Sequence, residues 1–180
     1  MTTAFVFRFT VVLIIGVANT MGSDMLRTFT GLTNAWDNTI TDSFALSETD
    51  IDVRMLTNVP PSANSSHAPV VITNTGNLAL ENFAEWDIIM QVTKTNSMDI
   101  EYLTYATTAE PGDGEWVVQG VYLQADSETA EIAEPNVLNP GEELVLLLRP
   151  TMNFQNKKWE RATFSTPNGV TGSVQFEVSN

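Results

Sequence analysis

Among its 180 residues the sequence contains no cysteine. That absence excludes a disulfide framework, a thiol nucleophile and a thiolate metal site. Positive charge is also scarce, because 8 Lys and Arg oppose 22 Asp and Glu and leave a formal net charge of −14. A domain this acidic repels phosphate groups, so we expect neither nucleic acid nor an anionic lipid surface as its partner.

Signatures of catalysis are missing as well. The single histidine, His67, follows a turn-rich stretch over residues 61–66, where we expect a solvated loop side chain and no catalytic base. The sequence has no Gly-rich phosphate loop, no nucleophile elbow and no His-x-x-x-His spacing. Carboxylates cluster at 110–115 and 126–134 without EF-hand spacing, which favours a solvated acidic face over a calcium site. We therefore predict a non-enzyme without cofactor, metal or small-molecule substrate.

What the sequence does have is a long hydrophobic start. Residues 4–18 are almost entirely apolar, and beyond Asp24 the apolar side chains recur every three or four positions, which is the spacing of one helix face. This pattern predicts one helix over residues 2–45, a rod of about 65 Å. We divide the chain into this helix, 1–46, and a head domain, 47–180. The side chains expected to pack against other helices are Phe5, Phe9, Leu13, Gly16, Leu26, Phe29, Leu32, Trp36, Ile40 and Phe44.

Three interpretations of the N-terminal segment were weighed. A cleavable leader is disfavoured because the start is uncharged and residues 17–19 make a poor cleavage site. A membrane anchor is marginal, because residues 4–18 fall short of the about 20 apolar residues of a spanning helix and include Arg8. Packing among identical helices in a bundle uses both halves of the segment, so it is the preferred interpretation.

Arg8 needs a partner in such a bundle, because an unpaired buried charge is costly. Asp24 of the same helix lies about 24 Å along the axis, which is out of reach. We therefore predict an ion pair between subunits, with Asp24 as a candidate acidic residue. The alternative is that Arg8 extends to the end of the bundle and stays hydrated.

The head has a different periodicity. From Ile51 onward, short runs of Val, Ile and aromatic residues alternate with polar ones and are separated by turn formers near 74–77, 111–114, 139–141 and 167–169. Seven to nine short strands of this kind predict an antiparallel sandwich. The run 144–148 is apolar throughout, so it should be a central strand or face a neighbouring subunit.

Two further features of the head are candidates for surface roles. Lys157, Lys158 and Arg161 form its only basic concentration and would suit a neighbour's acidic loop, although three cations around Trp159 can also simply flank a turn. Asn64 begins the one N-x-S/T tripeptide, a candidate glycosylation site.

The layout of a hydrophobic N-terminal helix before a sandwich resembles the archaellin superfamily. Two short motifs support the resemblance: Asn74-Thr75-Gly76 after the second strand, and the segment 138–142, Leu-Asn-Pro-Gly-Glu, before a late strand. The resemblance implies the α+β class, with a long N-terminal hydrophobic α-helix followed by an antiparallel Ig-like β-sandwich. The family comprises filament subunits of the archaeal rotary motility organelle and membrane-anchored accessory proteins.

The resemblance implies that many copies assemble through their helices into an extracellular cell-surface filament for motility or adhesion, after residing in the membrane. The partner would then be the chain itself. Family members are cut at a Lys/Arg-Gly site before the apolar run, and this sequence has none. Either the numbering starts at the mature end or no cleavage occurs, and the second case would favour the alternative role, an accessory protein whose sandwich binds an envelope or motor component.

Overall fold

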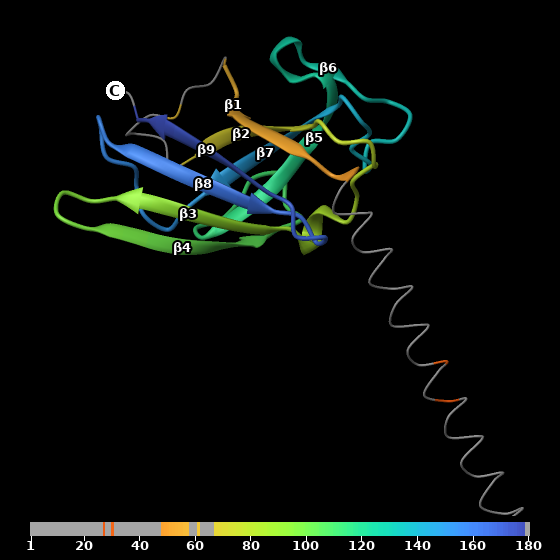
Figure 1. Cartoon of the computed structure of the whole chain (residues 1–180). Helices are drawn as coiled ribbons and strands as arrows, with labels where there is room; N and C mark the ends of the chain where they lie inside the picture. The colour runs from red at the N-terminus through yellow and green to blue at the C-terminus, as the bar shows by residue number, and fades with distance from the viewer. Residues whose placement is uncertain (1–26, 28–29, 31–47, 58–60, 62–66, 179–180) are drawn as a thin grey trace, which may run out of the picture. The chain divides into compact units, whose positions relative to one another are not determined.

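A computed structural model describes Arg27, Thr30 and residues 48–57, 61 and 67–178 of the chain (Figure 1). The predicted helix and its ten packing residues, together with Arg8, Asp24 and Asn64, lie outside the described residues, apart from Arg27 and Thr30, whose backbone is helical. Those predictions stay untested, as does the boundary at residue 46. Within the described part of the chain, no helix is long and apolar enough to cross a membrane.

The described head is built from strands. Two short 3-10 turns, η1 (Phe83–Glu85) and η2 (Ala125–Ser127), interrupt them. The nine strands are β1 (Ile51–Met55), β2 (Ala68–Asn74), β3 (Asp87–Thr93), β4 (Met98–Tyr105), β5 (Glu115–Gln124), β6 (Thr129–Ala130), β7 (Glu143–Arg149), β8 (Trp159–Ser165) and β9 (Thr171–Glu177).

The strands form one sheet that folds over on itself, in the order β1-β2-β7-β5-β4-β3-β8-β9, with β6 paired to β5 (Figure 1). This gives two layers, β1-β2-β7-β5 and β4-β3-β8-β9, and confirms a β-rich, sandwich-like head. The prediction of a wholly antiparallel sheet was wrong at one point. β4 and β5 pair in parallel through Thr104 and Tyr105, because the chain crosses from one layer to the other between them.

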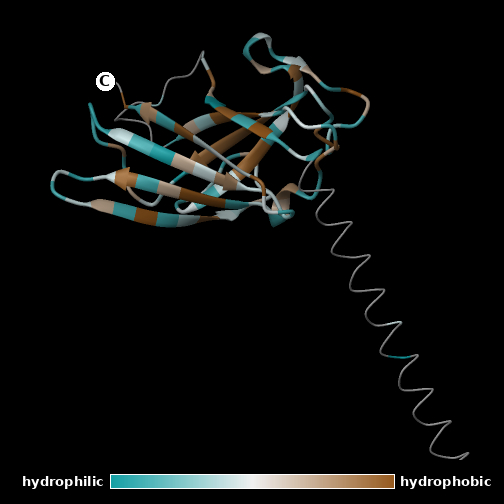
Figure 2. Cartoon of the chain, viewed as in Figure 1, coloured by the Kyte–Doolittle hydropathy of each residue, from teal (hydrophilic) through white to brown (hydrophobic). Residues whose placement is uncertain are grey.

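Alternation along the strands produces the two layers. In β3 the side chains of Ile88, Met90 and Val92 are buried, and the residues between them face outward. Most buried apolar side chains of both layers belong to one main hydrophobic cluster between them, and Figure 2 shows brown segments on strands of each layer. The outer faces of the two layers therefore point in opposite directions.

Strand β7 does not alternate, as its sequence predicted. It lies between β2 and β5, so the central position is confirmed. Leu144, Leu146 and Leu148 face the main core, and Val145 belongs to a second buried cluster with Val71 and Ala125 on the outer side. A polypeptide excursion after β5, which contains η2 and β6, covers that outer side and explains why the whole run is apolar.

Strands β1 and β9 end the sheet order and lie beside each other. A Cβ atom on Gly172 of β9 would come within 2.6 Å of Cγ2 of Val53 and 3.2 Å of the Ile51 side chain. Glycine is required there because no larger residue would allow the two strands to approach. The sheet is thereby almost closed into a barrel.

Candidate interaction surfaces

The predicted basic cluster lies where the chain enters β8. Lys157 adopts a left-handed backbone (φ 57°) in a turn, and its N–H donates a hydrogen bond of 2.9 Å to the carbonyl of Val178. Trp159 begins the strand with a side chain that is 55% exposed. The three cations therefore do flank a turn, and their role between subunits stays a prediction.

These cations differ from the others of the head in their ion pairing. Arg54 pairs with Asp126 and Glu143, Lys94 with Asp99, and Arg149 with Asp113. Within residues 67–178, Lys157, Lys158 and Arg161 have no carboxylate at ion-pair distance. Unpaired cations in a domain this acidic are available to an external anionic group.

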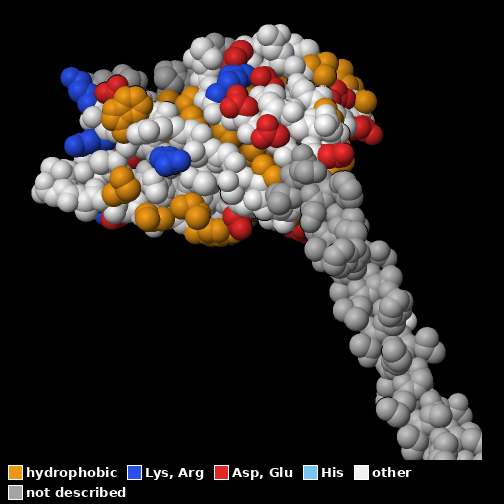
Figure 3. Space-filling model, viewed as in Figure 1, with side chains coloured by type: hydrophobic (Ala, Val, Ile, Leu, Met, Phe, Trp, Pro, Cys, Tyr) orange, Lys and Arg blue, Asp and Glu red, His pale blue; other side chains and the backbone are white. Residues whose placement is uncertain are grey.

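The outer face of β4-β3-β8 beside this cluster is unusually apolar. Successive cross-strand rows place Tyr102 opposite Ile89, and Ile100 opposite Gln91 and then Arg161. We call this surface the strand face, and its exposed large apolar residues are Ile89, Met98, Ile100, Tyr102 and Trp159. Figure 3 shows hydrophobic side chains along the lower margin of the head, over β4. Such a concentration of exposed apolar residues is typical of a protein–protein contact.

Sequence reasoning missed the strand face. The available signal was the segment from Met98 to Leu103, where apolar residues occupy one parity of the strand, at 98, 100 and 102, while Leu103 on the other parity enters the core. A strand with apolar residues on both sides, in a domain with enough core elsewhere, predicts an outer face with a partner.

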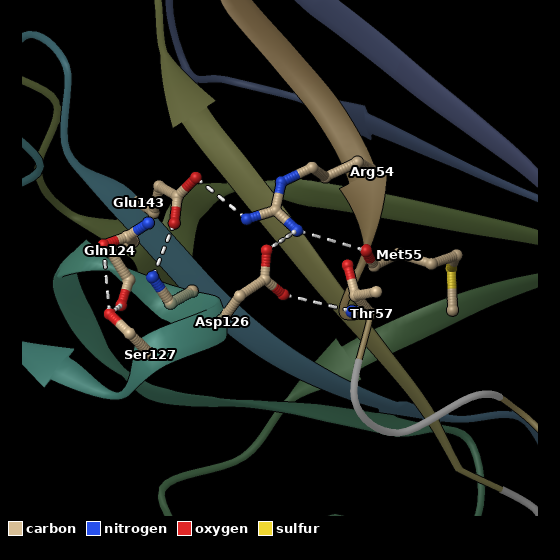
Figure 4. Close-up of polar contacts among 8 residues, drawn as sticks. Arg54, Met55, Thr57, Gln124, Asp126, Ser127 and Glu143 are labelled. Atoms are coloured by element: carbon tan, nitrogen blue, oxygen red, sulfur yellow. Dashed lines mark hydrogen bonds and ion pairs between the residues drawn. The ribbon is translucent and has the colours of Figure 1, made fainter.

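The second surface is the excursion over residues 125–137, which we call the acidic loop. Arg54 of β1 holds it in place (Figure 4): Nη1 lies 3.0 Å from Oδ2 of Asp126, and Nη2 lies 2.9 Å from Oε1 of Glu143. Asp126 also accepts a 3.2 Å hydrogen bond from the N–H of Thr57, and Glu143 accepts one of 2.6 Å from the N–H of Ala125. Three separate segments, around Arg54, Asp126 and Glu143, are thus joined at one guanidinium.

We call Arg54, Asp126 and Glu143 the Arg54 clamp. The pKa values of Arg54 and Asp126 are shifted in the directions that favour their charged forms. The backbone hydrogen bond from Thr57, followed by Arg54, holds the pKa of Asp126 below its usual value of 3.8. Burial alone would lower the pKa of Arg54, but its hydrogen bonds and charge interactions with Glu143 and Asp126 outweigh burial and raise it. Both shifts favour the charged forms of Arg54 and Asp126 at neutral pH.

Beyond the clamp, the acidic loop has its own internal order. Oε1 of Glu131 accepts hydrogen bonds from the N–H groups of Ala133 and Glu134, and these bonds hold the pKa of Glu131 below its usual value. Ile132, between them, is 89% exposed. An apolar side chain on an ordered loop, surrounded by carboxylates, is available for contact with a partner.

A hollow of about 460 Å³ lies beneath the start of this loop, on the outer side of β2, β7 and β5. Apolar side chains predominate in its lining, and Glu128 also borders it. The residues are Leu56, Pro69, Gln119, Tyr122, Ala125, Glu128, Ala130, Val145 and Leu147.

The structure also places the histidine and the carboxylates that the sequence offered as candidates for catalysis or metal binding. His67 directly precedes β2 and is half-buried, so the expectation of a fully solvated side chain was wrong. Within the described residues, no three Asp, Glu, His or Cys side chains are grouped closely enough to hold a metal ion. In the carboxylate runs, Asp126 and Asp113 serve as ion-pair partners of arginines.

Comparison with known protein structures identifies the fold of the head. No protein-family model and no curated protein match the sequence significantly. The archaeal flagellum of Methanospirillum hungatei strain JF1 matches with a TM-score of 0.58 at 10% identity, over 95% of this chain and 90% of that chain. Flagellin FlaB1 from Methanocaldococcus jannaschii matches with a TM-score of 0.50 at 12% identity, over 72% of this chain and 91% of that chain. The head has the archaellin fold.

A third structure, the archaellum periplasmic stator protein FlaG from Sulfolobus acidocaldarius, superposes with a TM-score of 0.47 at 14% identity, over 71% of this chain and 99% of that chain. The fold of the head agrees with the one that the resemblance to the archaellin superfamily implies, and the role of the chain within an assembly is a separate question.

Proposed function

We propose that this chain is a structural subunit that polymerises through residues 1–46 into an extracellular, archaellin-like filament for motility or adhesion. The observation that carries the proposal is the match of this chain to the flagellum of Methanospirillum hungatei, with a TM-score of 0.58 over 95% of this chain. The finer assignments, an Ig-like class for the sandwich and a long helix before it, belong to this proposal. The helix would first reside in the membrane and then exchange lipid contacts for contacts with other helices.

The composition of the head supports this role. Residues 47–180 carry a charge of −13, since residues 1–46 contribute −1 to the total of −14. Mutual repulsion keeps crowded copies soluble, while burial of helix side chains drives assembly at roughly 1.5 to 3 kcal/mol for each large apolar residue. Activity in this proposal is mechanical, and the partner is the chain itself.

The experiment is electron microscopy of filaments sheared from cells that produce the chain. We expect polymers made mainly of this chain, and we expect Phe29→Asp or Trp36→Asp to abolish them because each places a charge in the packed helix. Asn38→Asp, which falls on the opposite face if residues 2–45 form the predicted helix, is the matched control and should leave polymers intact. Normal filaments from both Phe29→Asp and Trp36→Asp would overturn the proposal.

The second candidate function is a membrane-anchored accessory protein whose head binds an envelope or motor component. The exposed strand face supports this accessory role, because an exposed apolar surface can also bind a different protein. Stoichiometry separates the two roles. A chain that is extracted from membranes as a monomer, and is absent from sheared filaments, would support the accessory role.

A further inference from the structure

We propose that adjacent heads bind each other head to tail, with the strand face of one copy on the acidic loop of the next. The proposal rests on the proposed function, because it requires copies of this chain to assemble. It adds the surfaces, the direction of the contact and the residues that provide its specificity.

The strand face supplies apolar area and positive charge together. Ile100, Gln91 and Arg161 lie in one cross-strand row of this face. Ile100 is 69% exposed, and Arg161 has no carboxylate at ion-pair distance within residues 67–178. Arg161 is oriented by donating a 2.9 Å hydrogen bond to Oγ of Ser173. Lys157 and Lys158 directly precede Trp159 at the start of β8, and the exposed Glu177 lies opposite Trp159 on β9.

The acidic loop supplies the complementary features. Ile132 is an exposed apolar residue of the loop, Glu128 and Glu134 are its exposed carboxylates, and Leu123, near the end of β5 just before the loop, is also exposed. The Arg54 clamp fixes this excursion before any partner arrives, so binding pays little ordering entropy. The hollow under the loop offers a recess for a large side chain. Because charge and apolar character match between two surfaces of one sequence, the fitting partner is a second copy.

The placement of the two surfaces determines the symmetry. The strand face covers the outside of β4-β3-β8, and the acidic loop covers the outside of β2-β7-β5, on the opposite side of the shared core. A contact between unlike surfaces is heterologous, and it generates rows of subunits unless the rotation closes a ring. The contact therefore extends along an assembly and does not stop at a dimer.

Cysteine cross-linking tests the contact, because the natural chain has no thiol. Ile132→Cys and Ile100→Cys are made in separate full-length chains with different tags, coexpressed, and treated in sheared filaments with a short bis-maleimide. We expect a mixed dimer of the two variants, which decreases as NaCl is raised before cross-linking. Neither variant alone should give a dimer, since a symmetric contact would join like residues.

Ala84→Cys is the matched control for Ile100→Cys, because Ala84 is exposed on η1 and belongs to neither surface. Its combination with Ile132→Cys should give no dimer. Adding Arg161→Glu should reduce the mixed dimer, and Arg161→Lys should retain it. Filaments without the mixed dimer would overturn the head-to-tail contact and leave the filament role intact, whereas the absence of any assembly of this chain would overturn both.

Discussion

The side-chain amide of Asn74, at the end of β2, donates a hydrogen bond of 2.9 Å to the backbone carbonyl of Leu138, across 64 residues of sequence. The same amide donates a second bond of 2.7 Å to the carbonyl of Leu78, while the Oδ1 atom of Asn74 accepts one from the N–H of Gly76. Backbone bonds from Asn74 to Glu142, and from Gly141 to Asn74, complete the junction. The turn that follows β2, at residues 74–78, and the turn that precedes β7, at residues 138–142, are therefore one structural unit.

Asn74→Ala should destabilise the head by about 2–3 kcal/mol, because it leaves the carbonyls of Leu78 and Leu138 without their side-chain donor in a buried site. Urea unfolding, followed by tryptophan fluorescence, measures the change. Asn77→Ala, at an exposed position in the same turn, is the control and should be nearly neutral. Equal stability of the two variants would refute the structural role of the Asn74 amide.

Arg54→Ala should release the acidic loop while leaving the two layers folded. The expected loss of global stability is about 1 kcal/mol, because the clamp is partly exposed to solvent. Hydrogen exchange should accelerate at residues 125–137 in particular. Lys94→Ala breaks the Lys94–Asp99 pair on another part of the head and is the control. Unchanged exchange in the loop of the Arg54 variant would show that other contacts hold it.

The clamp should also weaken in acid. The folded-state pKa of Asp126 is lowered, so its contribution is fully present above the ordinary value of 3.8 and is lost as pH falls through the lower folded value. Exchange of the Thr57 amide, which donates to Asp126, should report the loss. In Asp126→Asn that pH dependence should disappear, and its persistence would assign the titration to another group.

Glu160 should behave in the opposite way. Its side chain is 1% exposed, and burial raises the pKa of its carboxyl, although the Thr93 N–H and Lys158 partly offset burial. A raised folded-state pKa means that its favourable contribution is present below the ordinary value of 4.5 and is lost as pH rises through the folded value. Glu160→Gln should therefore be more stable than the natural chain at pH 7. Glu177→Gln, exposed on β9, is the control and should show no gain.

Much of the head could be predicted from the sequence, because its strands follow local rules. The alternation of Ile51, Val53 and Met55 matches β1, and the uniformly apolar run 144–148 matches the central strand β7. The apolar runs around Trp116 and Val121 together form one strand, β5, with a register irregularity between Val118 and Gly120.

Features that depend on distant segments were not predictable. The parallel pairing at Thr104 and Tyr105 follows from how the chain crosses between layers, and no local pattern encodes it. The same holds for the Arg54 clamp, whose partners Asp126 and Glu143 are far away in sequence. The basic cluster was found from composition alone, whereas the strand face required knowledge of which side of β4 enters the core.

The close approach of β1 and β9 at Gly172 affects the tendency of the head to aggregate. The edge strands of a sheet ordinarily expose unpaired backbone N–H and C=O groups. These groups can pair with a strand of another molecule, and such pairing leads to aggregation and amyloid. Here the two terminal strands of the sheet lie side by side, which limits access to their edges. A residue larger than glycine at position 172 would separate them and open both edges to pairing with other molecules.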